Sequence, residues 1–185
     1  MKNVIVFFFA FCFINNLAAQ SVTFQTIYEN QSYQLNSGGR ALLGGQSRTY
    51  VPIQIPNGAI GIIYTVKSSL NYDAGQNIQL AASLTASFTG HFILANAINR
   101  IQMPPSNAVI DVYLLPNTTN NLTYFLNKND GYWTQYQDYS CPSSLGCKMA
   151  VQVSSDMQTL YIALRNPSSI NRIVAIVDVV AVMSN

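Results

Sequence analysis

The chain has 185 residues, of which only 9% are Asp, Glu, Lys or Arg, against about 25% in typical soluble domains. Its formal net charge is +2, and no run of like charges occurs in it. These properties argue against nucleic acid as a partner, and they give little reason to expect contact with an anionic membrane.

The N-terminus has the layout of a secretory signal peptide. Lys2 provides a positive start, residues 4–14 are apolar, and Leu17-Ala18-Ala19 ends in small residues at the expected cleavage site. The apolar run is too short to span a membrane. The sequence therefore predicts a signal peptide over residues 1–19, and a single domain over residues 20–185 that is secreted or periplasmic.

The remainder of the chain is dominated by patterns typical of strands, separated by turn residues. Asn57-Gly58 is a strong turn signal and predicts a hairpin between its two flanking strands. Pro52 and Pro56 place the first of these strands at a sheet edge or beside a bend. The predicted fold class is mainly β (α+β), an antiparallel β-sandwich. The strands are expected at Val22–Tyr28, Arg48–Ile55, Ala59–Lys67, Ala108–Leu115, Leu122–Leu126, Met149–Val153, Leu160–Asn166 and Ile173–Val182, the last buried on both faces.

The segment Ile78–Leu94 fits two patterns. Apolar residues alternate with polar ones, as in a strand, yet large apolar residues also recur every fourth position, as on a helix. We favour an apolar helical insert around residues 76–102, one helix or two short ones, which closes an open face or edge of the sandwich. A membrane-spanning hairpin strand is the alternative.

Two cysteines, Cys141 and Cys147, remain after the signal peptide and flank a turn that contains Pro142 and Gly146. In an oxidising compartment such a pair most often forms a disulfide. A metal site would need further ligands, and His91 is the single histidine of the chain. We expect the disulfide, with no metal and no cofactor.

Three stretches of strand pattern resemble a known group of proteins. They are Arg48–Pro56 with Gly61–Val66, Ala108–Leu115, and Leu160–Pro167 leading into Ile176–Ala181. Together they resemble secreted bacterial β-sandwich domains of unknown function and, more loosely, the emp24-type GOLD domains and the bacterial pre-peptidase C-terminal domains. The resemblance implies a sandwich with a helical insert that serves as an accessory or binding module. It brings no catalytic residues with it.

Residues capable of acid–base chemistry are few. His91 could act as a general base, but the sequence contains no nucleophile-elbow or zinc-protease motif to accompany it. Asp111 suits an exposed position on a half-buried strand. Asp178 lies among apolar residues, so we expect it to be buried and paired with Arg165 or Arg172. The sequence thus predicts no catalytic site.

The candidate ligand-binding residues are four aromatics in the segment Gly131–Tyr139, accompanied by amides and one carboxylate. They are Tyr132, Trp133, Tyr136 and Tyr139. Aromatic faces stack on sugar rings and also anchor protein interfaces. The alternative is that Trp133 and one or two of the tyrosines pack into the sandwich.

These observations predict a non-enzymatic binding or accessory module that recognises a protein or a glycan at the cell surface. The alternative is a membrane-active, pore-forming-like protein that uses residues 78–94. The sequence does not define the ligand or the oligomeric state.

Overall fold

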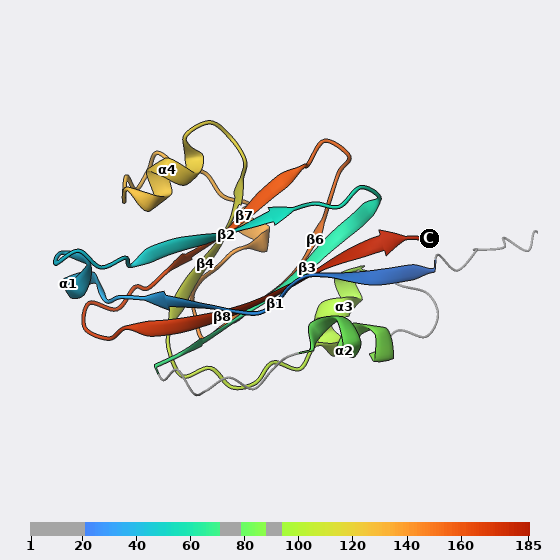
Figure 1. The fold of residues 1–185 in the computed structure, drawn as a ribbon, viewed down its shortest axis with the longest axis horizontal. Coiled ribbons are helices and arrows are strands. Elements are labelled where there is room, and N and C mark those ends of the chain that lie inside the picture. Colours follow the sequence, from blue (N-terminus) through green and yellow to red (C-terminus); the bar gives the residue numbers. More distant parts are fainter. Residues whose placement is uncertain (1–20, 71–78, 88–93) are drawn as a thin grey trace, which may run out of the picture.

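Two four-stranded antiparallel sheets pack face to face in the computed structural model, which describes residues 21–70, 79–87 and 94–185 (Figure 1). This arrangement confirms the predicted β-sandwich. The predicted signal peptide and His91 lie outside the described residues.

Sheet A has the strand order β1-β8-β3-β6, and sheet B has the order β2-β7-β4-β5. The strands of sheet A are β1 (Val22–Leu35), β8 (Ile173–Ser184), β3 (Ala59–Ser69) and β6 (Cys147–Gln152). Those of sheet B are β2 (Arg48–Gln54), β7 (Thr159–Arg165), β4 (Ile110–Pro116) and β5 (Cys141–Ser144). The helices are α1 (Gly38–Ala41), α2 (Leu80–Ser87), α3 (Leu94–Arg100) and α4 (Asn121–Leu126), with a short 3-10 turn η1 (Gln137–Tyr139).

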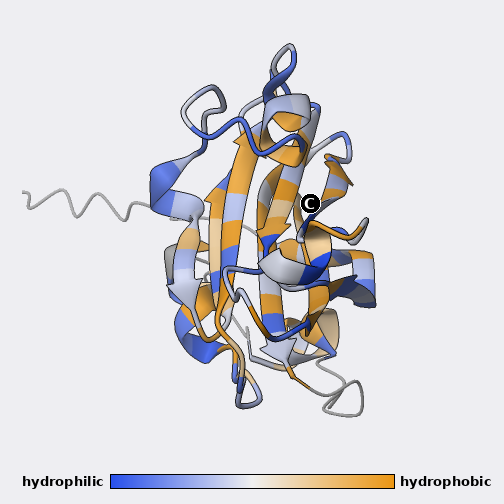
Figure 2. Cartoon of the chain, turned by 90° about the vertical axis from the view of Figure 1, so that its left-hand side faces the viewer, coloured by the Kyte–Doolittle hydropathy of each residue, from blue (hydrophilic) through white to orange (hydrophobic). Residues whose placement is uncertain are grey.

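Alternate residues of each sheet build the main core between the two layers. On β7, Leu160, Ile162 and Leu164 point inward, while Tyr161 and Ala163 face outward. Apolar residues consequently form bands along the strands in Figure 2, whereas much of the connecting loop chain is polar. Burial of these bands is the main source of stability of such a fold.

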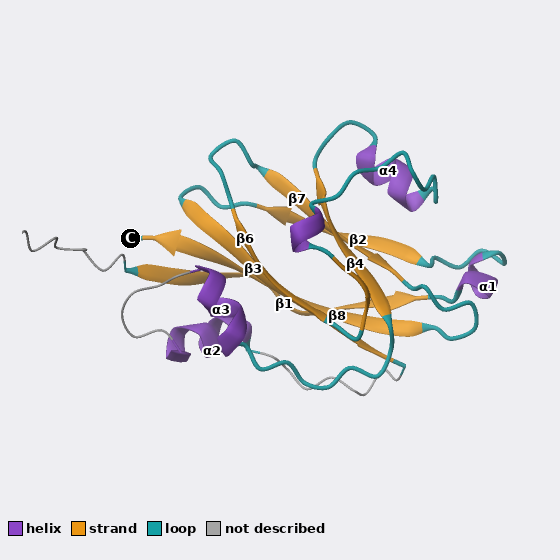
Figure 3. Ribbon diagram, turned by 180° about the vertical axis from the view of Figure 1, so that it is seen from behind, coloured by secondary structure: helices purple, strands orange, loops and turns teal. Residues whose placement is uncertain are grey.

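The outer face of sheet A is covered by α2 and α3, which lie together on one side of the sandwich (Figure 3). Leu80 and Leu84 of α2 and Ala97 of α3 pack against sheet A. The covering explains why β3 and β8 are buried on both faces over most of their length. The described part of residues 76–102 thus confirms the expected insert of two short helices that closes a face of the sandwich.

One predicted strand is wrong. Residues 122–126 belong to helix α4, which covers the outer face of sheet B. Leu122, Phe125 and Leu126 are spaced three and four residues apart, so one side of a helical turn carries all three against that face. A five-residue apolar run fits a strand equally well, and here packing decides between the two.

The predicted hairpin is also wrong, although its turn exists. The chain turns at Gly58, which has a φ of 85°, but it then crosses from sheet B to sheet A. Val51 and Ile62 would lie in the same core whether the two strands formed a hairpin or crossed between the sheets. The alternation of apolar residues in the sequence therefore does not distinguish the two arrangements. As expected from Pro52, β2 is an edge strand.

Candidate functional site

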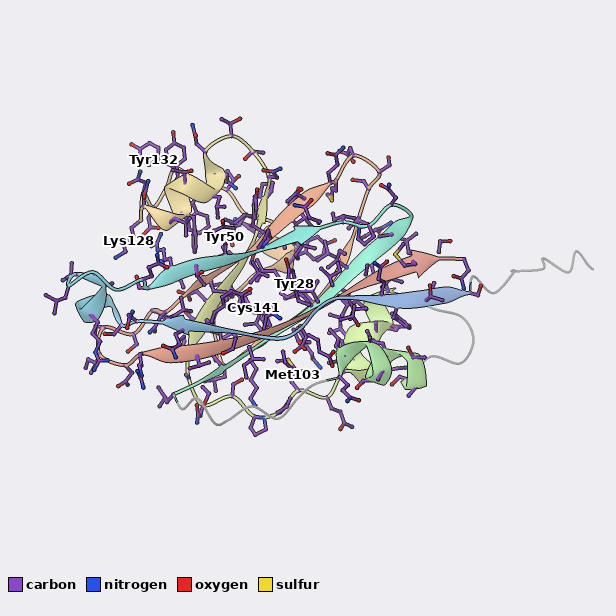
Figure 4. The ribbon with its side chains drawn as sticks, viewed as in Figure 1. Tyr28, Tyr50, Met103, Lys128, Tyr132 and Cys141 are labelled. Atoms are coloured by element: carbon purple, nitrogen blue, oxygen red, sulfur yellow. A yellow bond between two sulfur atoms is a disulfide. The ribbon has the colours of Figure 1, made fainter. Side chains whose placement is uncertain are left out.

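The four aromatic side chains predicted from the sequence do not form one surface. Tyr132 is 75% exposed, and its ring centroid lies 6.0 Å from that of Tyr124 (Figure 4). Trp133 is half-buried beneath α4, with centroid distances of 5.0 Å to Tyr113 and 5.3 Å to Phe125. Trp133 therefore anchors α4 to sheet B, and Tyr132 is the exposed ring of the pair.

Tyr136 and Tyr139 lie elsewhere, where the chain returns to the main core. The backbone N–H of Tyr136 donates to the carbonyl of Leu114 over 2.9 Å. The carbonyl of Tyr139 accepts a hydrogen bond from the hydroxyl of buried Tyr64. Burial raises the pKa of Tyr64 well above the ordinary value for tyrosine, so this hydroxyl remains a donor.

The predicted cysteines lie at disulfide-bonding distance, with their Cα atoms 5.8 Å apart. Cys147 is buried in the main core on sheet A, and Cys141 lies on β5 of sheet B. The bridge thus joins the two layers. Sγ of Cys147 lies 3.8 Å from the hydroxyl of Tyr64.

A charged cluster occupies the outer face of sheet B. Arg48, Arg165 and Asp111 are neighbours across β2, β7 and β4, and Nε of Arg165 donates to Oδ2 of Asp111 over 2.6 Å. Asp111 is fully buried, so its predicted exposure is wrong. The ion pair with Arg165 and the hydrogen bond from the backbone N–H of Ser143 offset the free-energy cost of removing its charge from water. Asp130 binds Arg48 over 2.9 Å, and these contacts hold the pKa of Asp130 below its ordinary value.

Asp178 is buried, as predicted, but its predicted arginine partners are wrong. It accepts hydrogen bonds from the backbone N–H of Asn30 over 2.9 Å and from Thr65 at 3.5 Å. Asn30 has a φ of 50° and lies at an irregularity in the pairing of β1 with β8. Asp178 therefore satisfies a backbone group that the strand pairing leaves free. Arg165 lies on the other sheet, paired with Asp111.

A hollow of about 310 Å³ lies where β4 ends and β7 begins; we call it the Tyr136 hollow. Its lining combines one of the predicted aromatics with amide, hydroxyl and carboxylate groups. The lining residues are Pro116, Asn117, Thr118, Tyr136, Asp156, Met157, Gln158, Thr159 and Leu160. A hydrogen bond from Ser154 lowers the pKa of Asp156, so this exposed side chain is a carboxylate at neutral pH.

The Tyr136 hollow is tied to the sheet by its polar groups. Oδ1 of Asn117 accepts from the hydroxyl of Tyr161 over 3.1 Å, and Thr159 bonds to Gln54 over 3.0 Å. The ring of Tyr161 meets Tyr50 edge-on, with centroids 5.7 Å apart. The hollow thus adjoins an aromatic pair on the outer face of sheet B.

A second hollow, of about 300 Å³, lies between the start of β2 and the end of α4. Tyr50 and Lys128 border it, and Figure 4 shows both on the α4 side of the molecule. We call it the Tyr50 groove. A third, of about 200 Å³, lies between Asp178 and the start of α2.

Asn117, Asp156 and Gln158 were not predicted as site residues. They belong to polar loop stretches in which Asn, Asp, Ser and Thr also serve as ordinary turn formers. Nothing in the sequence distinguishes the two uses. Their proximity to Tyr136 arises because β4 and β7 are neighbours in the sheet.

Within the described residues, no group of three or more His, Cys, Asp or Glu side chains is placed to hold a metal ion. Across the same residues, no helix combines the length and apolar character needed to cross a membrane.

Comparisons of the chain with protein-family models, with curated proteins and with solved structures find no match.

Proposed function

We propose that this protein is a secreted, non-catalytic β-sandwich module that binds a neutral glycan in the Tyr136 hollow. The observation that carries the proposal is the composition of that hollow: one aromatic residue, two amide residues, two threonines and an aspartate border one concave surface. The predicted secretory signal and the Cys141–Cys147 pair at disulfide-bonding distance support an extracellular location.

The lining matches the chemistry of a sugar. Sugar hydroxyls both donate and accept hydrogen bonds, and the side chains of Asn117, Gln158 and Thr118 can do the same. Asp156 adds a strong acceptor, and the ring of Tyr136 offers an apolar wall. At about 310 Å³ the hollow is at the small end of ligand sites, which favours recognition of one or two rings of a longer chain.

The test is a glycan array probed with the mature protein, followed by affinity measurements on the best ligand. Asn117→Ala and Gln158→Ala should each weaken binding about fivefold, the value of one hydrogen bond of about 1 kcal/mol. Both side chains are exposed, so thermal stability should change little. Gln152→Ala, an exposed amide on β6, is the matched control and should bind as the wild type does.

Tyr132→Ala separates this site from the aromatic segment predicted first. Tyr132 is exposed, so its removal tests binding without disturbing the core. Trp133→Ala would instead remove packing against Tyr113 and Phe125, and lost binding could reflect lost structure. Loss of glycan binding in Tyr132→Ala, with Asn117→Ala and Gln158→Ala unaffected, would move the site to α4.

A further inference from the structure

The end of the molecule beyond the last residue of β7 exposes large apolar side chains. Leu42 and Leu43, which follow α1, are 84% and 91% exposed. Ile170, in the loop between β7 and β8, is 79% exposed. Both segments project beyond the sheets at the same end in Figure 1. We call residues 38–44 with residues 167–172 the apolar tip.

The two segments of the apolar tip are joined to each other. The backbone N–H of Gly38 donates to the carbonyl of Ser168 over 2.8 Å, and that of Gly39 donates to Ser169 over 3.1 Å. Buried Asn166 lies behind them, with Nδ2 2.8 Å from the carbonyl of Asn171 and 3.2 Å from that of Leu35. Hydrogen bonds therefore fix the backbone of the two segments that carry the exposed apolar side chains.

The backbone of the short α1 turn explains why its leucines stay exposed. The N–H groups of Leu43 and Gly45 both donate to the carbonyl of Arg40, which closes the turn on itself. Gly44 has a φ of 100°, a conformation that favours glycine and turns the chain back toward β2. Leu42 and Leu43 are left at the apex.

The charges of the apolar tip are positive. Arg40 and Arg172 are exposed, and neither forms an ion pair within the part of the chain that the structure describes. Residues 36–47 and 166–173 contain no Asp or Glu. Asp130, an exposed carboxylate that follows α4, is already bound to Arg48. Arg40 and Arg172 lie far apart in the sequence, so only the fold brings this charge together.

We propose that the apolar tip docks the protein on an anionic lipid bilayer. The leucines and Ile170 would insert between headgroups, while Arg40 and Arg172 bind lipid phosphates. A specific protein interface engages about 20–30 residues on each side, far more than this projecting tip supplies. Each of the two segments of the apolar tip carries an exposed apolar side chain next to an arginine, which suits the apolar interior and the negative headgroups of an anionic bilayer. The Tyr136 hollow lies at the opposite end of β7, about 20 Å away, so both sites can be occupied together.

The test measures co-sedimentation of the mature protein with vesicles of phosphatidylcholine alone and of phosphatidylcholine mixed with phosphatidylglycerol. The proposal expects binding to the mixed vesicles that weakens as salt is raised. Arg40→Gln and Arg172→Gln should each weaken it about fivefold. The double variant Leu42→Ser/Leu43→Ser should abolish it, while Leu145→Ser, also an exposed leucine but between β5 and β6, should bind as the wild type does.

A fluorescence readout locates the contact. Emission of Leu43→Trp should shift to the blue on mixed vesicles, and emission of Leu145→Trp should not. Absence of vesicle binding, or binding that survives Leu42→Ser/Leu43→Ser, overturns the proposal. So does a wild-type dimer in light scattering that becomes a monomer in that variant, because the tip would then be a contact between copies of the chain.

Discussion

At the scale of single residues, the buried carboxylates serve the architecture of the sandwich. Asp111 joins β4 to β7 and to the disulfide-linked β5, and Asp178 completes the irregular pairing of β1. Their burial was foreseeable for Asp178, whose sequence neighbours are apolar. It was not for Asp111, because its partners Arg165 and Ser143 lie on the neighbouring strands β7 and β5, and β5 was not predicted.

Asp178→Asn should stabilise the protein at neutral pH. Burial raises the pKa of Asp178, despite the hydrogen bonds from Asn30 and Thr65, and nearby Glu29 acts in the same direction. Between the pKa of Asp178 in the unfolded chain and its higher pKa in the folded protein, the folded state binds more protons than the unfolded state. The contribution of Asp178 to stability therefore falls as the pH rises between these two values. An amide keeps the acceptor for Asn30 without the buried charge.

Thermal melts of the wild type and Asp178→Asn across acidic to neutral pH check this. The difference in Tm should be small in acid, where Asp178 is protonated, and grow toward neutral pH. A difference that does not depend on pH would contradict the argument.

Arg165→Met should destabilise the protein by about 3 kcal/mol, because it leaves the fully buried Asp111 without its cation. Urea denaturation measures the loss. The double variant Arg165→Met/Asp111→Asn removes the buried charge as well and should recover most of the stability. If the double variant is no more stable than Arg165→Met, the buried charge is not the cause.

At the scale of elements, strands with a sustained apolar pattern were predictable and segments without one were not. The prediction covered only Val22–Tyr28 of β1, which continues to Leu35. β2, β3, β7 and β8 were located to within a few residues, since each carries a sustained apolar pattern. β5 contains Cys141-Pro142-Ser143-Ser144, without any such pattern, and was missed. The partners of each strand depended on contacts across the core, as the crossing from β2 to β3 shows.

Replacing both cysteines, as Cys141→Ala/Cys147→Ala, should lower the free energy of unfolding by about 2 kcal/mol, mainly by freeing the unfolded chain. Urea denaturation with and without a reducing agent measures this. The reductant should bring the wild type close to the variant and leave the variant unchanged. The prediction would be contradicted if a thiol assay showed that the reductant had fully reduced the wild type and its free energy of unfolding were nevertheless unchanged.

At the scale of the whole molecule, the sandwich separates two surfaces along β7: the Tyr136 hollow before its first residue and the apolar tip beyond its last. The sequence predicted Tyr136 as a candidate ligand-binding residue, and Tyr136 borders the hollow in which we propose that a glycan binds. The sequence could not predict the lining of this hollow, because Asn117, Tyr136 and Gln158 come from three loops that meet only in the folded sheet.

The most direct test of the glycan site is an NMR titration of the ¹⁵N-labelled mature protein with the best glycan from the array. We expect saturable shifts of the backbone amides of residues 117, 118, 136 and 156–160, which border the Tyr136 hollow. Shifts confined to the Tyr50 groove or to Tyr132, or no saturable shifts with any glycan tested, would contradict it.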